Sequence, residues 1–147
     1  MIYTQEPNNF NSKFEVVSCF LEYDKKILLL HRQNHKPQGG TWGIPAGKIN
    51  SNEHILDAII REIKEETGLK LLPTQLSYFK KTYVKLPNLS FIFHIYHYKL
   101  DKLPKITINS DEHKDLCWTT PKLALTMDII SDLDQHIKLF YQDLEDN

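Results

Sequence analysis

The sequence predicts a domain that contains both helices and strands, of the α+β or α/β class. Segments rich in aromatic and β-branched residues, typical of strands, occur before and after a central helical pattern at residues 52–67. A second helical pattern at residues 129–144 follows the last of them. The length of 147 residues suits one domain with a sizeable core, so we expect a single domain over residues 1–147.

The N-terminal part is expected to contain two strands. Residues 1–13, MIYTQEPNNFNSK, are mostly polar and are expected to form a loosely ordered lead-in. The next segments, FEVVSCFLEY at 14–23 and KILLLHR at 26–32, are apolar and are separated by a short turn. We expect these two strands to be neighbours in a sheet.

The central helix is predicted by an apolar stripe with helical spacing, formed by Leu56, Ile59, Ile60 and Ile63. Ser51 or Asn52 can cap its first turn, and Gly68 stands where a left-handed C-terminal cap is expected. The helix should therefore pack on a core and extend from about residue 52 to about residue 67.

The second half of the chain is expected to contain a hairpin, a strand and a helix. Residues 76–86 and 89–100 predict a long hairpin around Pro87 and Asn88, and the Cys-Trp pair at 117–118 is placed at the end of another strand. The closing helix is predicted by a stripe at helical spacing, formed by Ile130, Leu133, Ile137, Phe140 and Leu144.

Composition excludes several classes of protein. The net charge of −1 and the pI near 6.6, without a basic stripe, argue against a long nucleic acid as partner. The sequence shows neither a secretory leader nor an apolar run long enough to cross a membrane, so we expect a cytoplasmic protein without membrane contact. Cys19 and Cys117 are isolated and are expected to be free thiols.

Three carboxylates share one face of the central helix, because Glu62, Glu65 and Glu66 have the spacing i, i+3 and i+4. A solvated acidic face is the ordinary explanation of such a run. Here the adjacent apolar stripe would hold the carboxylates at the edge of a core, where they could bind a cation. Oxygen ligands without histidine or cysteine favour Mg²⁺ or Mn²⁺ over zinc.

The segment TWGIPAGK precedes this helix and contains Gly43, Pro45 and Gly47. These residue types allow sharp turns and close approach of the backbone to a ligand. A turning loop, a helix and a candidate metal site are therefore contiguous in the sequence.

The combined pattern resembles the signature of the Nudix hydrolase family. Its specified positions are all matched, by Gly47, Glu53, Arg61, Glu62, Ile63, Glu65, Glu66, Gly68 and Leu69. The flanking ILLLHR and WGIPAGK, and a later acidic segment ending in tryptophan, are also typical of the family. The resemblance implies an α/β/α sandwich with a mixed sheet and metal-dependent attack of water on a phosphorus of a nucleoside diphosphate linked to another group.

The resemblance also implies roles for individual residues. Glu62, Glu65 and Glu66 would bind divalent metal, and Glu62 is also a candidate base for the attacking water. The carbonyl of Ala46 would be a further metal ligand. Arg61 would hold a glutamate in place by a charge-assisted hydrogen bond, and its expected partner is Glu53.

Three candidates lie outside the signature. Arg32 and Lys48 could bind substrate phosphate, although a solvated surface role explains each of them as well. Glu112, within the segment SDEHKDLCW, could complete the metal site or could belong to a solvated acidic turn. Trp42, Tyr83, Phe93 and Trp118 could stack on a nucleobase, but core packing is the commoner role of aromatic residues.

Within the resemblance, a MutT-like nucleoside triphosphate pyrophosphatase is the leading interpretation. ADP-ribose or a dinucleoside polyphosphate is an alternative substrate. A non-catalytic nucleotide-binding module on the same scaffold is a second class, which the intact glutamates disfavour. An isomerase of the isopentenyl diphosphate type is a third, and neither cysteine stands in the motif it needs. We expect a monomer or a homodimer.

Overall fold

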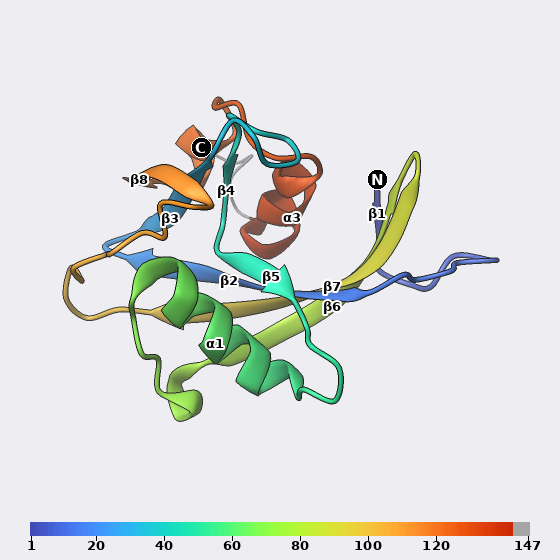
Figure 1. Cartoon of the computed structure of the whole chain (residues 1–147), viewed down its shortest axis with the longest axis horizontal. Helices are drawn as coiled ribbons and strands as arrows, with labels where there is room; N and C mark the ends of the chain where they lie inside the picture. The colour runs from blue at the N-terminus through green and yellow to red at the C-terminus, as the bar shows by residue number, and fades with distance from the viewer. Residues whose placement is uncertain (143–147) are drawn as a thin grey trace.

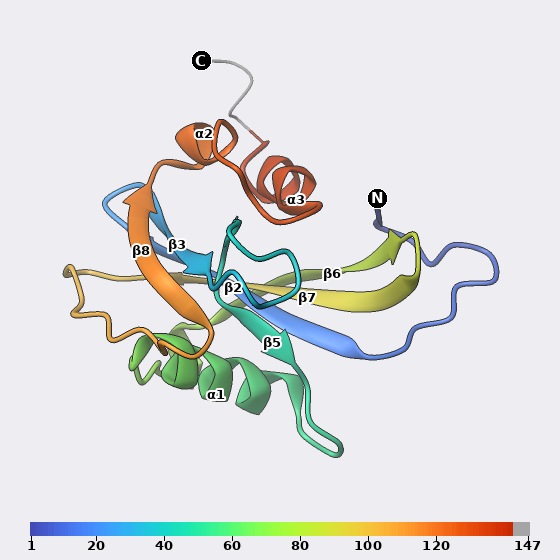
Figure 2. The same cartoon turned by 45° about the horizontal axis from the view of Figure 1, so that its top comes forward.

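The computed structural model describes residues 1–142; residues 143–147 lie outside the described part. In the described residues an eight-stranded sheet separates α1 (Ile55–Thr67) from α2 (Pro121–Ala124) and α3 (Leu133–Phe140) (Figures 1 and 2). A short 3₁₀ turn, Pro73–Gln75, follows α1. This architecture is the α/β/α sandwich that the resemblance implies.

The sheet is mixed, as expected. Its principal strand order is β1-β6-β7-β2-β3-β4, with β5 beside β2 and β8 beside β3. Only the β2–β7 pairing is parallel among the described strands. The strands are β1 (Ile2–Tyr3), β2 (Glu15–Tyr23), β3 (Lys26–Arg32), β4 (Trp42–Gly43), β5 (Ala46–Lys48), β6 (Ser77–Leu86), β7 (Leu89–Lys99) and β8 (His113–Thr119).

Three strand predictions are confirmed. β2 and β3 are neighbours, and Tyr23 pairs with Lys26 beside the turn. β6 and β7 form the long hairpin, which closes with Leu86 opposite Leu89. The strand expected to end near residues 117–118 is β8.

Strand β2 has different antiparallel partners at its two ends, and this arrangement positions the candidate site. Val16, Val17 and Ser18 pair with β5, whereas the last two residues of β2 pair with β3. The short strand β5 consequently lies between β2 and α1, as Figure 2 shows. The loop residues that precede the signature helix are therefore fixed against that helix.

Alternating side chains of β2 and β3 supply two apolar cores, one on each face of the sheet. Leu21 and Leu28 belong to the core under α1, which also contains Ile59 and Ile63. Phe20 and Leu29 belong to the opposite core, under α2 and α3. Because successive strand residues point to opposite faces, these nearly continuous apolar strands hold helices on both sides.

The start of α1 differs from the prediction. The helix begins at Ile55, and its N-cap is His54, whose Nδ1 accepts a hydrogen bond from the amide of Leu56 at 3.2 Å. Ser51 and Asn52 lie in a turn before the helix, and Asn52 has φ +64°, so neither is the cap. The predicted C-terminal cap is confirmed, because Gly68 has φ +79°.

The closing helix is shorter than predicted. It begins at Leu133 because Asp132 has φ +69°, a left-handed conformation that cannot continue a helix backwards. It ends at Phe140, and the predicted stripe residue Leu144 lies outside the described residues. No helix in the described part of the chain is long and apolar enough to cross a membrane.

The lead-in is more ordered than expected at its beginning. Ile2 and Tyr3 pair with Val84 and Tyr83 of the hairpin as strand β1. The ring of Phe10 then packs edge-on against that of Tyr83, with centroids 5.3 Å apart. The expectation of a loosely ordered segment is therefore wrong for these residues, because an exposed edge of β6 provides hydrogen-bonding partners for them.

Candidate functional site

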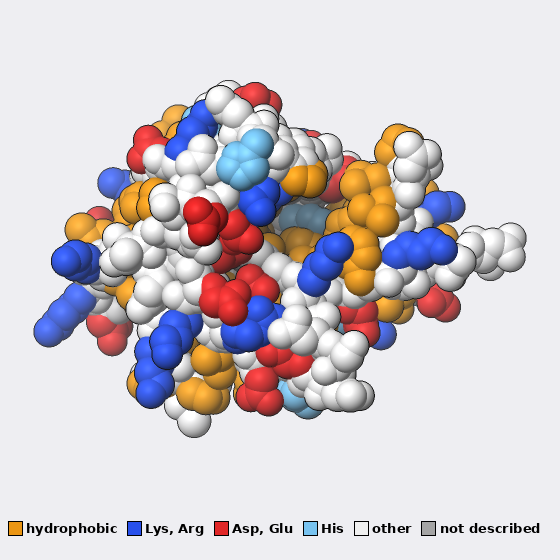
Figure 3. All heavy atoms as spheres, viewed as in Figure 1, with side chains coloured by type: hydrophobic (Ala, Val, Ile, Leu, Met, Phe, Trp, Pro, Cys, Tyr) orange, Lys and Arg blue, Asp and Glu red, His pale blue; other side chains and the backbone are white. Residues whose placement is uncertain are grey.

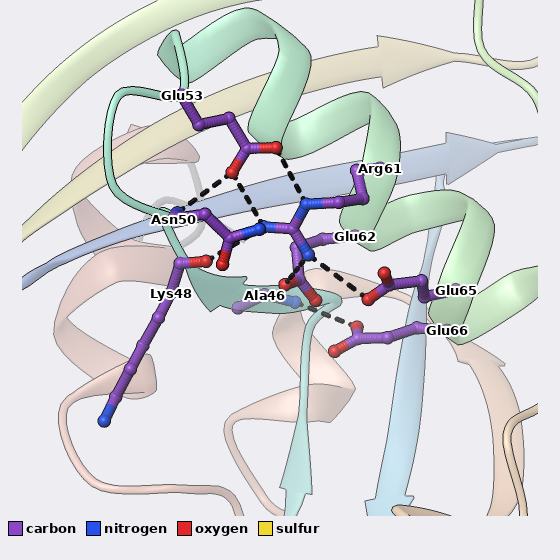
Figure 4. Close-up of polar contacts among 8 residues, drawn as sticks. All are labelled: Ala46, Lys48, Asn50, Glu53, Arg61, Glu62, Glu65 and Glu66. Atoms are coloured by element: carbon purple, nitrogen blue, oxygen red, sulfur yellow. Dashed lines mark hydrogen bonds and ion pairs between the residues drawn. The ribbon is translucent and has the colours of Figure 1, made fainter.

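Arg61 is the centre of a polar network on α1 (Figure 4). Its Nε and Nη2 donate to the two carboxylate oxygens of Glu53 at 2.8 and 2.9 Å, a bidentate contact. Its Nη1 donates to Glu62 at 2.7 Å and more weakly to Glu65 at 3.3 Å, and its Nη2 also reaches the carbonyl of Lys48 at 3.0 Å. The guanidinium thus ties the helix to the loop before it and to β5.

This network explains the charge states of its two central members. The hydrogen bonds from Arg61 are the main cause that lowers the pKa of Glu53 to about 2, and the amide of Asn50 adds to them. The bonds to Glu53 and Glu62 in turn raise the pKa of Arg61 above its ordinary value. Arg61 and Glu53 are therefore both charged at neutral pH, and the contact predicted between them is present.

Glu66 is a nearly buried carboxylate, with 4% of its surface exposed. Its Oε2 accepts a hydrogen bond from the backbone amide of Ala46 at 3.1 Å. Burial raises the pKa of Glu66 well above the usual value, and the nearby charges of Glu62 and Glu112 raise it further, while the amide of Ala46 and the charge of Arg32 oppose them. Within residues 1–142 Glu66 makes no ion pair, which a buried charged carboxylate needs.

Glu62 reaches from α1 to β5 and packs on Gly47. A β-carbon built at Gly47 would overlap the Glu62 carboxylate, so only glycine leaves room for that side chain. The side chain of Glu62 is 12% exposed, and burial raises its pKa although Arg61 opposes the shift. The spacing between Gly47 and Glu62 in the signature thus corresponds to a direct contact.

Two connected cavities lie beside these carboxylates. The smaller, about 240 Å³, is lined by acidic, basic and backbone groups: Arg32, Lys36, Pro37, Ala46, Gly47, Lys48, Glu62, Glu66, Glu112 and His113. The larger, about 410 Å³, shares most of these residues and extends along an apolar surface that includes Phe14, Phe91 and Phe93. Figure 3 shows the hollow between acidic and basic side chains on this face, with apolar side chains beside it.

Most of the predicted site residues lie together around the smaller cavity. Glu62, Glu66, Ala46, Arg32, Lys48 and Glu112 all line it. Glu65 does not line either cavity; its side chain is 54% exposed and contacts Arg61. The side chain of Lys48 points away from Arg61 in Figure 4, and its amino group lies over the ring of Phe14, 4.2 Å from the centroid.

The residues fit a divalent cation, although they do not form a preformed cage. In residues 1–142, no group of three His, Cys, Asp or Glu side chains is arranged to hold a metal ion. Glu62 and Glu65 instead accept hydrogen bonds from Arg61. Burial is the main cause that raises the pKa values of Glu62 and Glu66, and the negative charge of Glu112 adds to both shifts. A cation placed among them would relieve this repulsion, and an all-oxygen set suits Mg²⁺ or Mn²⁺.

Two buried histidines that the sequence did not single out also line the site. His113 follows Glu112 and lines both cavities, and burial together with Arg32 and Lys36 lowers its pKa to about 4. His136 lies in α3, lines the larger cavity and stacks on Phe93, with ring centroids 4.4 Å apart. No local motif marks either residue, because both reach the site through long-range packing.

Comparisons with known proteins agree with this geometry. The family described as NUDIX domain matches residues 13–142. CTP pyrophosphohydrolase of Escherichia coli is 31% identical over 113 residues, which cover 76% of this chain and 78% of that protein. The uncharacterized Nudix hydrolase YvcI of Bacillus subtilis is 44% identical over 61 residues, 42% of this chain but only 36% of that protein. The crystal structure of a MutT protein from Methanosarcina mazei superimposes with a TM-score of 0.77 at 20% identity, covering 88% of this chain and 94% of the other.

Proposed function

The chain belongs to the NUDIX domain family and is a Nudix hydrolase, and we propose that it is a MutT-like pyrophosphatase whose substrate is a nucleoside triphosphate. Its activity as a pyrophosphohydrolase on nucleoside diphosphate derivatives follows from the family. The choice of a triphosphate is the proposal, and it rests on the form and charge of the two cavities.

The observation that carries the proposal is the mixed lining of the smaller cavity. Carboxylates of Glu62 and Glu66 line it together with the basic side chains of Arg32 and Lys48. A polyphosphate needs both kinds of group, since carboxylates hold the cation that bridges phosphate oxygens and basic residues neutralise the remaining charge. A site made of acids alone would repel the substrate.

We assign the metal to Glu62, Glu66 and Glu112, with Glu65 and the carbonyl of Ala46 as further ligands and Mg²⁺ as the expected ion, Mn²⁺ as its substitute. A divalent cation at this place supplies charge neutralisation and lowers the pKa of water. Arg61 holds Oε1 of Glu62 at 2.7 Å. This contact leaves Oε2 to accept the proton of the attacking water, whose oxygen then forms a bond to phosphorus as the bridging oxygen leaves.

The larger cavity supports a nucleoside as the organic part of the substrate. It continues from the phosphate region along Phe14, Phe91 and Phe93, and a volume of about 410 Å³ falls in the range of small-molecule sites. Aromatic side chains at that end suit a base. The name of the Escherichia coli relative, CTP pyrophosphohydrolase, makes CTP the first triphosphate to test.

A turnover screen tests the proposal. The purified chain with Mg²⁺ would be given canonical and oxidised nucleoside triphosphates, ADP-ribose, nucleotide sugars and dinucleoside polyphosphates, and the products separated by chromatography. Glu66→Gln removes the buried carboxylate, and Glu6→Gln makes the same change at an exposed position as the matched control. A triphosphate preference that only Glu66→Gln abolishes supports the proposal.

The other outcomes select the alternatives. Preference for ADP-ribose or a dinucleoside polyphosphate would replace the substrate and keep the reaction. Nucleotide binding without turnover would establish the non-catalytic module instead. We propose that the protein is cytoplasmic, and the free thiols of Cys19 and Cys117 support this localisation. We expect it to be a monomer or a homodimer.

A further inference from the structure

His113 occupies an unusual position at the beginning of β8. Its backbone is in register with Arg32, the last residue of β3, so the two side chains come from neighbouring strands. His113 lines both cavities, as Arg32 does, and it directly follows Glu112. It therefore lies where the candidate metal site meets the basic side of the cavity.

The ring of His113 is buried and incompletely satisfied. The residue is 6% exposed, and its Nδ1 is the one buried side-chain nitrogen or oxygen without a hydrogen-bond partner in residues 1–142. Two other buried histidines are paired: His94 with Glu15 at 2.7 Å and His136 with Thr82 at 2.8 Å. Such an orphan atom is costly if it carries a proton, so it constrains which nitrogen of the ring can be a donor.

The missing partner also decides which nitrogen carries the proton. A proton on Nδ1 would bury a donor that has no acceptor, whereas a proton on Nε2 leaves only a lone pair there. A doubly protonated ring would bury the same unpartnered N–H donor at Nδ1. His113 is thus a neutral ring whose Nε2–H is its available donor.

We propose that His113 is a phosphate-binding residue whose Nε2–H donates a hydrogen bond to a phosphate oxygen of the substrate, beside Arg32 and Lys36. A neutral donor suits this place, since a third cation would repel those two side chains and a carboxylate would repel phosphate. The inference rests on the proposed function in that the substrate is a polyphosphate.

Two substitutions test the role of the His113 N–H donor independently of the planar ring. His113→Phe keeps a planar ring and removes both nitrogens, whereas His113→Gln keeps an N–H donor at the distance of Nε2. His94→Phe is the control, because His94 has the same 6% exposure and lies outside both cavities. The probe is inorganic tripolyphosphate with Ca²⁺, measured by titration calorimetry, so that neither a nucleobase nor turnover is needed.

We expect His113→Phe to weaken tripolyphosphate binding about tenfold or more, the loss typical of a hydrogen bond to a charged group. His113→Gln should bind within about threefold of the wild type, and His94→Phe should bind as the wild type does. KM for the preferred nucleotide should rise in His113→Phe with a smaller change in kcat.

Thermal unfolding distinguishes binding from a structural role. Because His113→Phe removes an orphan polar atom, its unfolding temperature should equal or exceed that of the wild type while binding is weaker. Unchanged tripolyphosphate affinity in His113→Phe, or an equal loss in His113→Gln, would overturn the proposal. If the wild-type chain hydrolyses no nucleotide but His113→Phe still weakens tripolyphosphate binding, the proposed function is overturned. The role of His113 in phosphate binding then stands.

Discussion

The carboxylate of Glu62 lies against the backbone of Gly47, in the space that a β-carbon at residue 47 would fill. Gly47 belongs to β5 and Glu62 to α1, so the contact joins this strand to the helix that follows it. The carboxylate is held on its other side by Arg61 at 2.7 Å. Glu62 is consequently fixed between a glycine and an arginine.

Gly47→Ala should reduce turnover at least tenfold, because the new methyl group displaces the Glu62 carboxylate by more than this chemistry tolerates. The fold should persist, since Gly47 does not have a positive φ and alanine fits its backbone conformation. Steady-state kinetics and thermal unfolding of the purified variant check both parts. Wild-type kcat in Gly47→Ala would show that the position of Glu62 is unimportant.

Arg61→Lys should lower kcat by about tenfold to a hundredfold with little change in KM. Lysine keeps the charge but cannot make the bidentate contact with Glu53 while it also holds Glu62. The measurement is kcat and KM with Mg²⁺ in excess, beside Lys64→Arg as a control on the exposed face of the same helix. Equal kcat values for Arg61→Lys and the wild type would contradict a positioning role.

Local patterns in the sequence predicted the elements whose determinants are local. The β6–β7 hairpin is an example, because apolar strands flank the two turn residues Pro87 and Asn88. The parallel pairing of β2 with β7 was not predictable in this way, since it joins Glu15 to Ile92 across about half of the chain. The start of α1 was misplaced because Ser51 and Asn52 are good caps by type, whereas the turn conformation of Asn52 gives that role to His54.

The residues of the candidate site likewise include some that local spacing predicted and others whose position depends on packing between distant segments. Glu62 and Glu66 were found from their spacing, because a helix places residues four apart on one face. The burial of Glu66 against Ala46 and the exposure of Glu65 were not found, since they depend on how β5 packs against α1. His113 carries no sequence signal, because only the pairing of β8 with β3 brings it beside Arg32.

Glu66→Gln should lower kcat by a factor of about a hundred or more, since it replaces a charged oxygen ligand by a neutral amide at the metal site. The variant should be at least as stable as the wild type without metal, because glutamine removes a buried charge that has no ion-pair partner. Kinetics and thermal unfolding in chelator test the two expectations. Near-normal turnover would remove Glu66 from the catalytic site.

Removal of divalent metal should abolish turnover, and Mg²⁺ should restore it. Ca²⁺ should restore it poorly, because the larger ion accepts irregular geometry and more ligands, whereas Mg²⁺ requires a near-octahedral arrangement. Turnover would be measured in chelator and after addition of each ion, with thermal unfolding as a second readout of metal binding. Full activity in chelator would contradict the mechanism.

His136 makes stability depend on pH in the acid range. Burial lowers its pKa to about 4, although Asp132 and Asp134 oppose the shift, while an unfolded histidine titrates near 6.5. Between these values the unfolded chain binds a proton that the folded chain does not, so this contribution to stability is complete above about pH 6.5 and is lost as the pH falls toward 4. From pH 7.5 to pH 5 the loss from this group is about 2 kcal/mol. His136→Phe should be less stable at pH 7.5, because Thr82 loses its hydrogen-bond partner at 2.8 Å. Its free energy of unfolding should nevertheless fall less than that of the wild type on acidification, as denaturant titrations at the two pH values would measure.

Equal losses of unfolding free energy in the wild type and the variant would show that another group causes the pH dependence. His113 would be the next residue to substitute, because its pKa is also lowered to about 4.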